Sequence, residues 1–166
     1  MSAQRTNHAI YNGYSQHFHP LSGISAITHK YIHSDDYLFF LGNTDPKKNV
    51  PRTLKAYSLY LKRSSRKRPL LIADLREDKL DMILREQHIE EIKPYLSYPG
   101  YISNKDLAYL YNGAFVFLYT SLRESFGIPM LEAMACGTPV ITGNTSAMPE
   151  IAGKEDYWQI LSTKKK

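Results

Sequence analysis

The chain has 166 residues, of which 43% are hydrophobic and 22% charged, a composition typical of a soluble globular protein with one domain. The net charge of +5 comes largely from short basic runs at residues 62–63, 66–68 and 164–166, and no nucleic-acid-binding motif accompanies them. The single cysteine, Cys136, excludes an intrachain disulfide framework and favours a reducing compartment. The first twenty residues carry no apolar stretch of a signal peptide, and no run approaches the roughly twenty apolar residues of a membrane span. We therefore expect a cytoplasmic protein that does not bind nucleic acid.

Residues 1–35 show no sustained periodicity, and we interpret them as a connecting segment ahead of one domain over residues 36–166. Residues 9–11 are compatible with a short strand, which the Asn12-Gly13 turn would end. His17 and His19 flank Phe18 and would share one face of a strand. Two histidines without further ligands do not make a zinc site, so we expect neither a metal nor a cofactor.

The rest of the chain alternates between predicted strands and predicted helices. Apolar runs predict strands at residues 36–41, 68–73, 95–98, 114–119 and 138–142, with a further edge candidate at 157–161. Helices are predicted at residues 50–63, 79–92, 129–136 and 147–152, and one more begins after a cap at Ser103. This alternation predicts an α/β fold with a doubly wound, mostly parallel, Rossmann-like sheet of about five to six strands. Ligands of such sheets bind beyond the carboxyl ends of the strands.

The most informative stretch runs from Ser121 to Glu132, between the fourth predicted strand and the helix after it. Gly127 marks a tight turn, and Pro129 suits the first turn of a helix. Free N–H groups at such a helix N-terminus can hold an anion. Glu124 precedes the helix and Glu132 lies about one turn inside it, so the two carboxylates would meet separate hydroxyl clusters of one elongated ligand. A phosphate site with carboxylates on either side indicates a nucleotide-sugar.

Two further loops follow predicted strands and should meet the same crevice. The first contains Gly42, Asn43 and Lys48, and the lysine can reach a phosphate oxygen. The second follows the Pro99-Gly100 turn and contains Tyr101 and Ile102, where backbone groups can read a nucleobase edge while a side chain covers the ring.

At this point the sequence resembles a known family. Residues 124–140, Glu-Ser-Phe-Gly-Ile-Pro-Met-Leu-Glu-Ala-Met-Ala-Cys-Gly-Thr-Pro-Val, are similar to the Glu-x7-Glu signature of family 4 retaining glycosyltransferases of GT-B fold. Residues 39–49 resemble the family's phosphate-binding lysine loop, and residues 100–111 its base-binding turn and helix. Residues 148–153 resemble the segment after its fifth strand, and residues 11–13 the turn that ends the last strand of its other domain.

The resemblance implies a role for each matching residue. Glu124 would orient the donor hexose as the catalytic residue, Glu132 would hold the ribose, and Lys48 would neutralise the diphosphate. Backbone groups of Phe126, Gly127 and Ile128 would contact the hexose and phosphates. The implied reaction transfers a hexose from a UDP-, GDP- or ADP-sugar to a hydroxyl acceptor with retention and without a metal, in polysaccharide or glycolipid synthesis.

Two departures from the family leave alternatives open. Many members carry arginine where this chain has Asn43, which would remove one bidentate phosphate contact. The sequence also matches only the donor-binding half of a GT-B enzyme, so we expect an N-terminal acceptor domain as partner, peripheral membrane association of the full enzyme, and little turnover by the chain alone. A non-catalytic binding subunit and an inert remnant stay open. A nicotinamide-dependent oxidoreductase is disfavoured because no Gly-x-Gly-x-x-Gly follows the first predicted strand.

Overall fold

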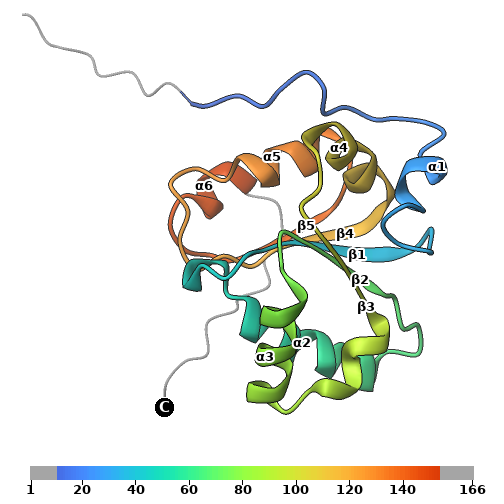
Figure 1. Cartoon of the computed structure of the whole chain (residues 1–166). Helices are drawn as coiled ribbons and strands as arrows, with labels where there is room; N and C mark the ends of the chain where they lie inside the picture. The colour runs from blue at the N-terminus through green and yellow to red at the C-terminus, as the bar shows by residue number, and fades with distance from the viewer. Residues whose placement is uncertain (1–10, 154–166) are drawn as a thin grey trace, which may run out of the picture.

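The computed structural model describes residues 11–153, which form an α/β fold around one parallel sheet (Figure 1). Every neighbouring pair of strands in the order β3-β2-β1-β4-β5 is parallel. All five predicted strands are confirmed within a few residues. Their bounds are β1 (Tyr37–Leu41), β2 (Leu70–Ala73), β3 (Leu96–Gly100), β4 (Ala114–Tyr119) and β5 (Val140–Thr142). The candidate strand at 157–161 and residues 9–10 of the short N-terminal strand lie outside the described residues.

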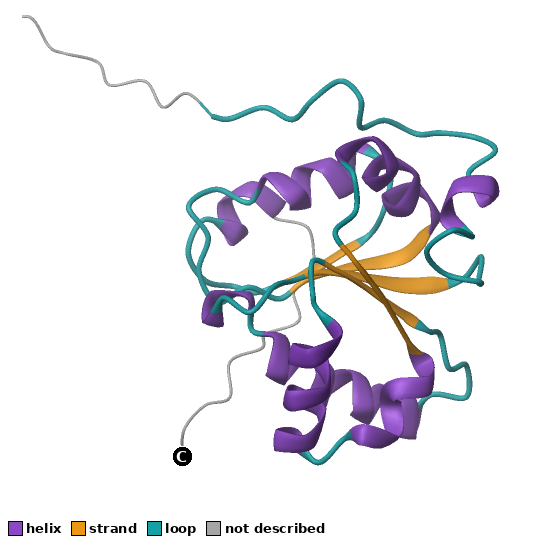
Figure 2. Ribbon diagram, viewed as in Figure 1, coloured by secondary structure: helices purple, strands orange, loops and turns teal. Residues whose placement is uncertain are grey.

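Helices cover both faces of the sheet (Figure 2). One layer consists of α4 (Asn104–Gly113), α5 (Ile128–Ala135) and α6 (Met148–Ala152), with α1 (Ser25–Thr28) packed beside α4. The other consists of α2 (Val50–Arg63), α3 (Glu77–Gln87) and the 3-10 helix η2 (Glu90–Tyr95), while the short 3-10 helix η1 (Pro46–Lys48) follows β1. The doubly wound Rossmann-like architecture predicted from the sequence is therefore confirmed.

Alternation along the strands builds a separate core on each face of the sheet. Phe39 and Phe117 pack beneath α4 and α5, where Phe39 lies 5.3 Å from the ring of Tyr111 between centroids. Leu38 and Phe40 face the opposite way and pack with Leu54 and the other apolar residues of α2 and α3. Because successive side chains of a strand point to opposite faces, one apolar run supplies both cores.

The helix predicted at residues 79–92 is shorter than expected. It begins at Glu77 and ends at Gln87, because His88 adopts a left-handed conformation with φ of 53°. The N–H of Ile89 then donates to the carbonyl of Leu84, and the N–H of His88 donates to that of Arg85. These bonds form a Schellman motif that ends an α-helix. The residues after it form η2 instead.

The third strand also differs from its prediction, since it begins at Leu96 and runs through Pro99 and Gly100, which were expected to form a turn. β3 lies at the edge of the sheet, where a proline costs no ladder hydrogen bond. Ala73 pairs with Gly100 after a shift in register.

His17 and His19 do not lie on a strand, so they do not share a strand face. Their segment is a turn, and a ring N–H of each donates separately, His17 to the carbonyl of Lys105 and His19 to that of Gln16. Among residues 11–153 no group of three or more His, Cys, Asp and Glu side chains converges as a metal site. No helix in that range is long and apolar enough to cross a membrane.

Candidate functional site

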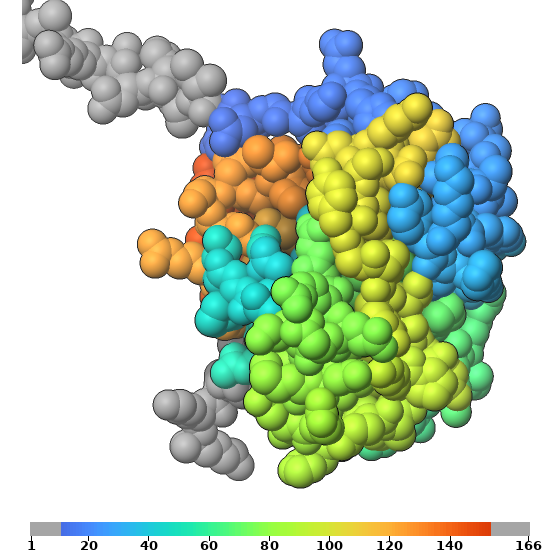
Figure 3. All heavy atoms as spheres, in the orientation of Figure 1, coloured from blue at the N-terminus to red at the C-terminus, as the bar shows by residue number. Residues whose placement is uncertain are grey.

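The loops after β1 and β4 lie side by side at the carboxyl edge of the sheet, where the strand order reverses. Several hydrogen bonds join them: the N–H of Leu122 donates to the carbonyl of Lys47 at 2.7 Å, and the side-chain amide of Asn49 donates to the carbonyl of Thr120 at 3.0 Å. In Figure 3 the residues after β1 (cyan) meet those after β4 (orange) on one side of the molecule. In doubly wound sheets, this reversal point is where ligands bind.

Lys48 and Glu124 form an ion pair across this junction. The Nζ of Lys48 lies 2.8 Å from Oε1 of Glu124, and only 16% and 14% of the two side chains are exposed. Burial acts to raise the pKa of Glu124, but the hydrogen bond and charge of Lys48, helped by the hydroxyls of Ser121 and Tyr119, hold this pKa below its usual range. Lys48 ends η1, whose first turn is capped by Asp45 through the N–H of Lys47.

Gly127 ends the turn after β4 and precedes the first residue of α5. Its φ of 108° lies in the left-handed region that favours glycine, and Pro129 follows within the first turn of the helix. The first N–H groups of an α-helix have no partner within the helix, so this end of α5 offers donors beside Glu124. Two hydrogen bonds fix the conformation of the turn: the hydroxyls of Thr145 and Ser146 donate to the carbonyls of Leu122 and Glu124.

Glu132 occupies a different environment on α5. It is partly buried, and the hydroxyl of Tyr111 donates to Oε2 over a long 3.4 Å. Burial raises the pKa of Glu132 despite this hydrogen bond. The two carboxylates of the site therefore have pKa values displaced in opposite directions.

The first predicted loop uses Gly42 and Asn43 structurally. A Cβ on Gly42 would lie 2.5 Å from the ring of Phe40, so any larger residue here would have to displace that buried ring. Asn43 is exposed, and its side-chain oxygen accepts from the N–H of Asp45 at 3.0 Å. The loop thus positions Lys48.

Tyr101 and Ile102, predicted near the nucleobase, follow β3, which is separated from β1 by β2. Their side chains differ sharply: Tyr101 is 79% exposed, whereas Ile102 is 2% exposed and belongs to the core beneath α4. Of these two side chains, only that of Tyr101 is exposed enough to pack against a nucleobase. Neither residue contacts the Lys48–Glu124 pair among the described hydrogen bonds.

Phe126 and Ile128 flank Gly127. Phe126 is partly buried and its ring lies 6.1 Å from that of Tyr11, whose hydroxyl donates to Oε1 of Glu150 at 2.6 Å. The side chain of Ile128 is 40% exposed. The N-terminal segment thus reaches the site through Tyr11, a contact that sequence reasoning did not predict.

Two other residues near the Lys48–Glu124 pair were also missed. Asp74 directly follows β2 with a φ of 63°, and burial raises the pKa of its carboxyl while the charge of Lys48 opposes this shift. Gly42 was selected as a candidate because it directly follows a buried strand. Asp74, a polar residue directly after β2, meets the same criterion. Tyr119 ends β4 as part of an apolar run, so its sequence context indicates a core residue only.

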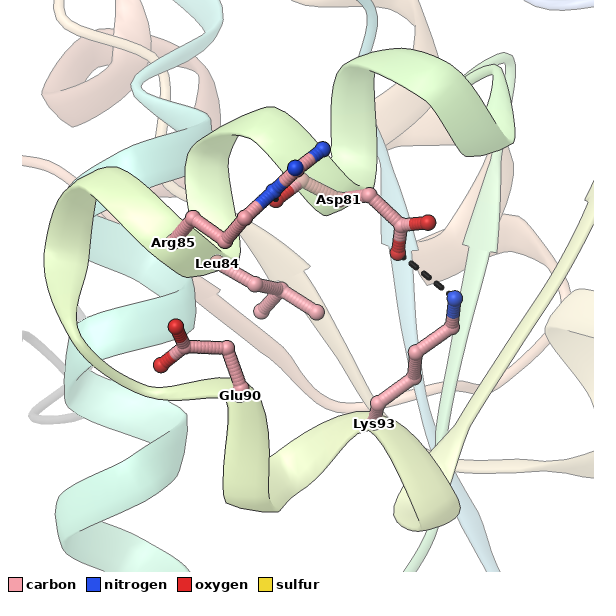
Figure 4. A pocket seen from close by; sticks show the side chains of 5 residues that line it. All are labelled: Asp81, Leu84, Arg85, Glu90 and Lys93. Atoms are coloured by element: carbon pink, nitrogen blue, oxygen red, sulfur yellow. Dashed lines mark hydrogen bonds and ion pairs between the residues drawn. The ribbon is translucent and has the colours of Figure 1, made fainter.

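A hollow of about 300 Å3 lies elsewhere, between α3 and η2, and is lined by Asp81, Leu84, Arg85, Glu90 and Lys93 (Figure 4). Lys93 spans it to Asp81 with a 2.6 Å ion pair. Because η2 leads into the start of β3, this hollow lies away from the carboxyl edge of the sheet. Its two acidic and two basic side chains balance in charge, and its lining residues include neither an α-helix N-terminus nor a strand end like those beside the Lys48–Glu124 pair.

Comparison with known proteins agrees with the fold and shows the family. Residues 28–162 match the family described as glycosyl transferases group 1. O-antigen chain mannosyltransferase B of Escherichia coli is 38% identical over 119 residues, which cover 70% of this chain and 31% of that protein. The serotype-specific mannosyltransferase WbdA of Escherichia coli is 33% identical over 135 residues, which cover 80% of this chain and 17% of that protein. The chain therefore spans less than a third of either relative.

A solved structure shares the fold. It is the C-terminal domain of a group 1 glycosyl transferase, LpcC, from Francisella tularensis, with a TM-score of 0.67 and 18% sequence identity. The superposition covers 90% of this chain and 80% of that domain. The described residues thus have the architecture of one half of a GT-B enzyme.

Proposed function

Since the chain belongs to the glycosyl transferases group 1 family, we propose that it is the nucleotide-sugar-binding half of a family 4 retaining GT-B hexosyltransferase. Residues 36–166 form the donor domain in this proposal, and residues 1–35 the connection to an acceptor domain. The observation that carries it is the partly buried Lys48–Glu124 pair at the reversal point of the sheet, beside the N-terminus of α5. A lysine, a helix N-terminus and a carboxylate together match a diphosphate joined to a sugar.

Donor binding would proceed by exchange of partners. The Lys48 ammonium turns from Glu124 to the diphosphate, where it and the N–H groups near Gly127 stabilise the charge that grows as the sugar departs. Glu124, released from the ammonium, accepts hydrogen bonds from the hexose hydroxyls. Glu132 accepts from the ribose, and Tyr101 lies against the base.

The chemistry proposed is transfer of the hexose to a hydroxyl with retention of its anomeric configuration. The departing phosphate takes the proton of the acceptor hydroxyl as the new glycosidic bond forms. We propose that Lys48 and the helix dipole carry the leaving-group charge without a metal. The two Escherichia coli relatives are named as mannosyltransferases, so a mannosyl donor and a polysaccharide acceptor are the first to test.

Calorimetric titration with UDP, GDP and ADP tests donor binding directly. We expect saturable binding of one nucleotide, abolished in Glu132→Ala and retained in Glu86→Ala, which removes an exposed carboxylate from α3. Binding of none up to millimolar concentration would contradict the proposal for this chain and favour an inert remnant.

A transfer assay separates the enzyme from a binding subunit. With the matching nucleotide-sugar and a mannan acceptor, we expect little product from the chain alone and turnover once an acceptor domain is supplied. An acceptor-domain partner that co-purifies as a separate protein, with activity only on mixing, would favour a non-catalytic subunit that completes another chain. Rapid transfer by the isolated chain would contradict the proposed division between two domains.

A further inference from the structure

Tyr119 combines deep burial with a hydroxyl that lacks a partner. The residue is 1% exposed, and its hydroxyl makes no hydrogen bond to any described residue. Buried polar groups in native proteins are almost always paired, so an unpaired donor is an exception that requires an explanation. Among residues 11–153, the buried hydroxyl of Thr142, the Cα partner of Tyr119 on β5, also lacks a hydrogen-bond partner. Both lie where β4 and β5 end at the carboxyl edge of the sheet.

The surroundings of Tyr119 place its hydroxyl at the phosphate end of the proposed site. A Cβ on Gly127 would lie 3.5 Å from Cε1 of the tyrosine and 3.9 Å from its hydroxyl oxygen, so the ring lies directly beneath the turn that opens α5. The Nζ of Lys48 lies 5.7 Å from the ring centroid on another side. The hydroxyl is therefore close to the two groups that would hold the diphosphate.

The same hydroxyl stays protonated under all working conditions. Burial raises the pKa of Tyr119 most, and the carboxylate of Glu124 raises it further, since it lies near the hydroxyl although the two form no hydrogen bond of ordinary geometry. The charge of Glu132 adds a smaller effect in the same direction. A neutral phenol in this position can donate one hydrogen bond, and an anion is its strongest available acceptor.

We propose that Tyr119 is a diphosphate-binding residue, whose hydroxyl donates to a phosphate oxygen of the bound nucleotide-sugar between Lys48 and the N-terminus of α5. This inference rests on the proposed function, because the diphosphate is the ligand that the crevice is argued to hold. It adds to the site a neutral donor from within the sheet, in addition to the ammonium and the backbone groups. Because Tyr119 lies in an apolar strand, the sequence pattern alone does not indicate this role.

The test compares Tyr119→Phe with Tyr37→Phe, since both remove one hydroxyl from a fully buried tyrosine of the sheet. The hydroxyl of Tyr37 donates to the carbonyl of Leu110 at 2.8 Å, far from the crevice. We expect Tyr37→Phe to lower the melting temperature and to leave nucleotide affinity unchanged. We expect Tyr119→Phe to leave the melting temperature of the ligand-free chain unchanged or raised, because it removes an unpaired buried group.

In titrations of the full 166-residue chain with the nucleoside diphosphate that the native chain binds, we expect Tyr119→Phe to weaken affinity about tenfold or more. The matching nucleoside, which has no phosphate, should bind both proteins alike. Equal diphosphate affinity would overturn the inference while the proposed function stands. Equal weakening for nucleoside and diphosphate, or a melting temperature lowered as in Tyr37→Phe, would also overturn it. If the native chain binds no nucleotide, the proposed function and this inference both fail.

Discussion

Glu124 and Glu132 show how the surroundings of single residues displace the pKa values of two carboxylates in opposite directions. Glu124 is held ionised by Lys48, whereas burial makes Glu132 a weaker acid than usual. An ionised, partnered carboxylate can exchange its lysine for sugar hydroxyls without a change of protonation. A partly buried carboxylate with one long hydrogen bond gains most when a ligand hydroxyl satisfies it.

Replacing Glu124 with Gln should destabilise the ligand-free chain at pH 7 by about 1.5–3 kcal/mol, the usual worth of a hydrogen bond to a charged group. The folded-state pKa of Glu124 is lowered, so its contribution is present above the ordinary value near 4.5 and is lost as pH falls through the lowered pKa. Urea unfolding between pH 3 and 7 measures this. Asp35→Asn, in an ion pair with 73% of its carboxylate side chain exposed, is the control and should change little. A loss in Glu124→Gln that is independent of pH would contradict the ion-pair account.

Glu132→Gln should have the opposite dependence on pH. The folded-state pKa of Glu132 is raised, so the native protein loses stability as pH rises through the ordinary value near 4.5 towards the raised pKa. The neutral glutamine does not ionise, and the variant should therefore gain stability relative to the native chain across that window. If the free energy of unfolding changes equally with pH in the native chain and in Glu132→Gln, burial does not raise the pKa of this carboxyl.

The turn between β4 and α5 is the element that gathers the site. The N–H of Leu122 in this turn donates to Lys47 in the loop after β1, and the turn accepts hydrogen bonds from residues after β5. The ends of three strands therefore fix its backbone path. Gly127 lets this path turn sharply enough for α5 to begin beside Glu124. A Cβ there would meet Tyr119 only at ordinary van der Waals distance, so backbone conformation rather than crowding demands the glycine.

Gly127→Ala should therefore cost about 1–3 kcal/mol of stability through backbone strain and should weaken nucleotide binding. Gly13→Ala is the matched control, since Gly13 has no positive φ and no atom within 4 Å of an added Cβ. Thermal unfolding of both variants measures the difference. Equal melting temperatures would mean that the turn relaxes readily into a conformation open to alanine.

At the scale of the whole molecule, a ligand at the reversal point would join loops that belong to both layers of the fold. The loop after β1 leads into α2 on one face, and the loop after β4 leads into α5 on the other. Binding there should stabilise the complete domain, since a ligand that binds only the native state shifts the unfolding equilibrium.

At a nucleotide concentration of about 100 times the dissociation constant, unfolding should cost about 2.7 kcal/mol more than without ligand. Hydrogen exchange should slow at residues 42–48 and 120–128 and stay unchanged around the hollow between α3 and η2. Thermal unfolding and exchange mass spectrometry measure these effects. Protection confined to α3 and η2 would place the nucleotide in the wrong part of the molecule for the proposed function.

Much of this protein could be predicted from its sequence, because strands, helices and turns depend on short-range patterns. The helix at residues 50–63, the strand at 114–119, the cap at Ser103 and the turn before α5 all follow from local apolar spacing and turn chemistry. The alternation of these elements was enough to predict the doubly wound sheet and its ligand-binding edge.

Only the tertiary structure decided which distant residues became neighbours. Lys48 and Glu124 meet across 76 positions because β1 and β4 pair, and no local pattern states that pairing. The extension of β3 through Pro99 depends on pairing with β2 and on the edge position of the strand, neither of which a local pattern states. Tyr119 is the clearest case: the sequence marks an aromatic residue in an apolar strand, and only packing leaves its hydroxyl buried, unpaired and beneath the turn at Gly127.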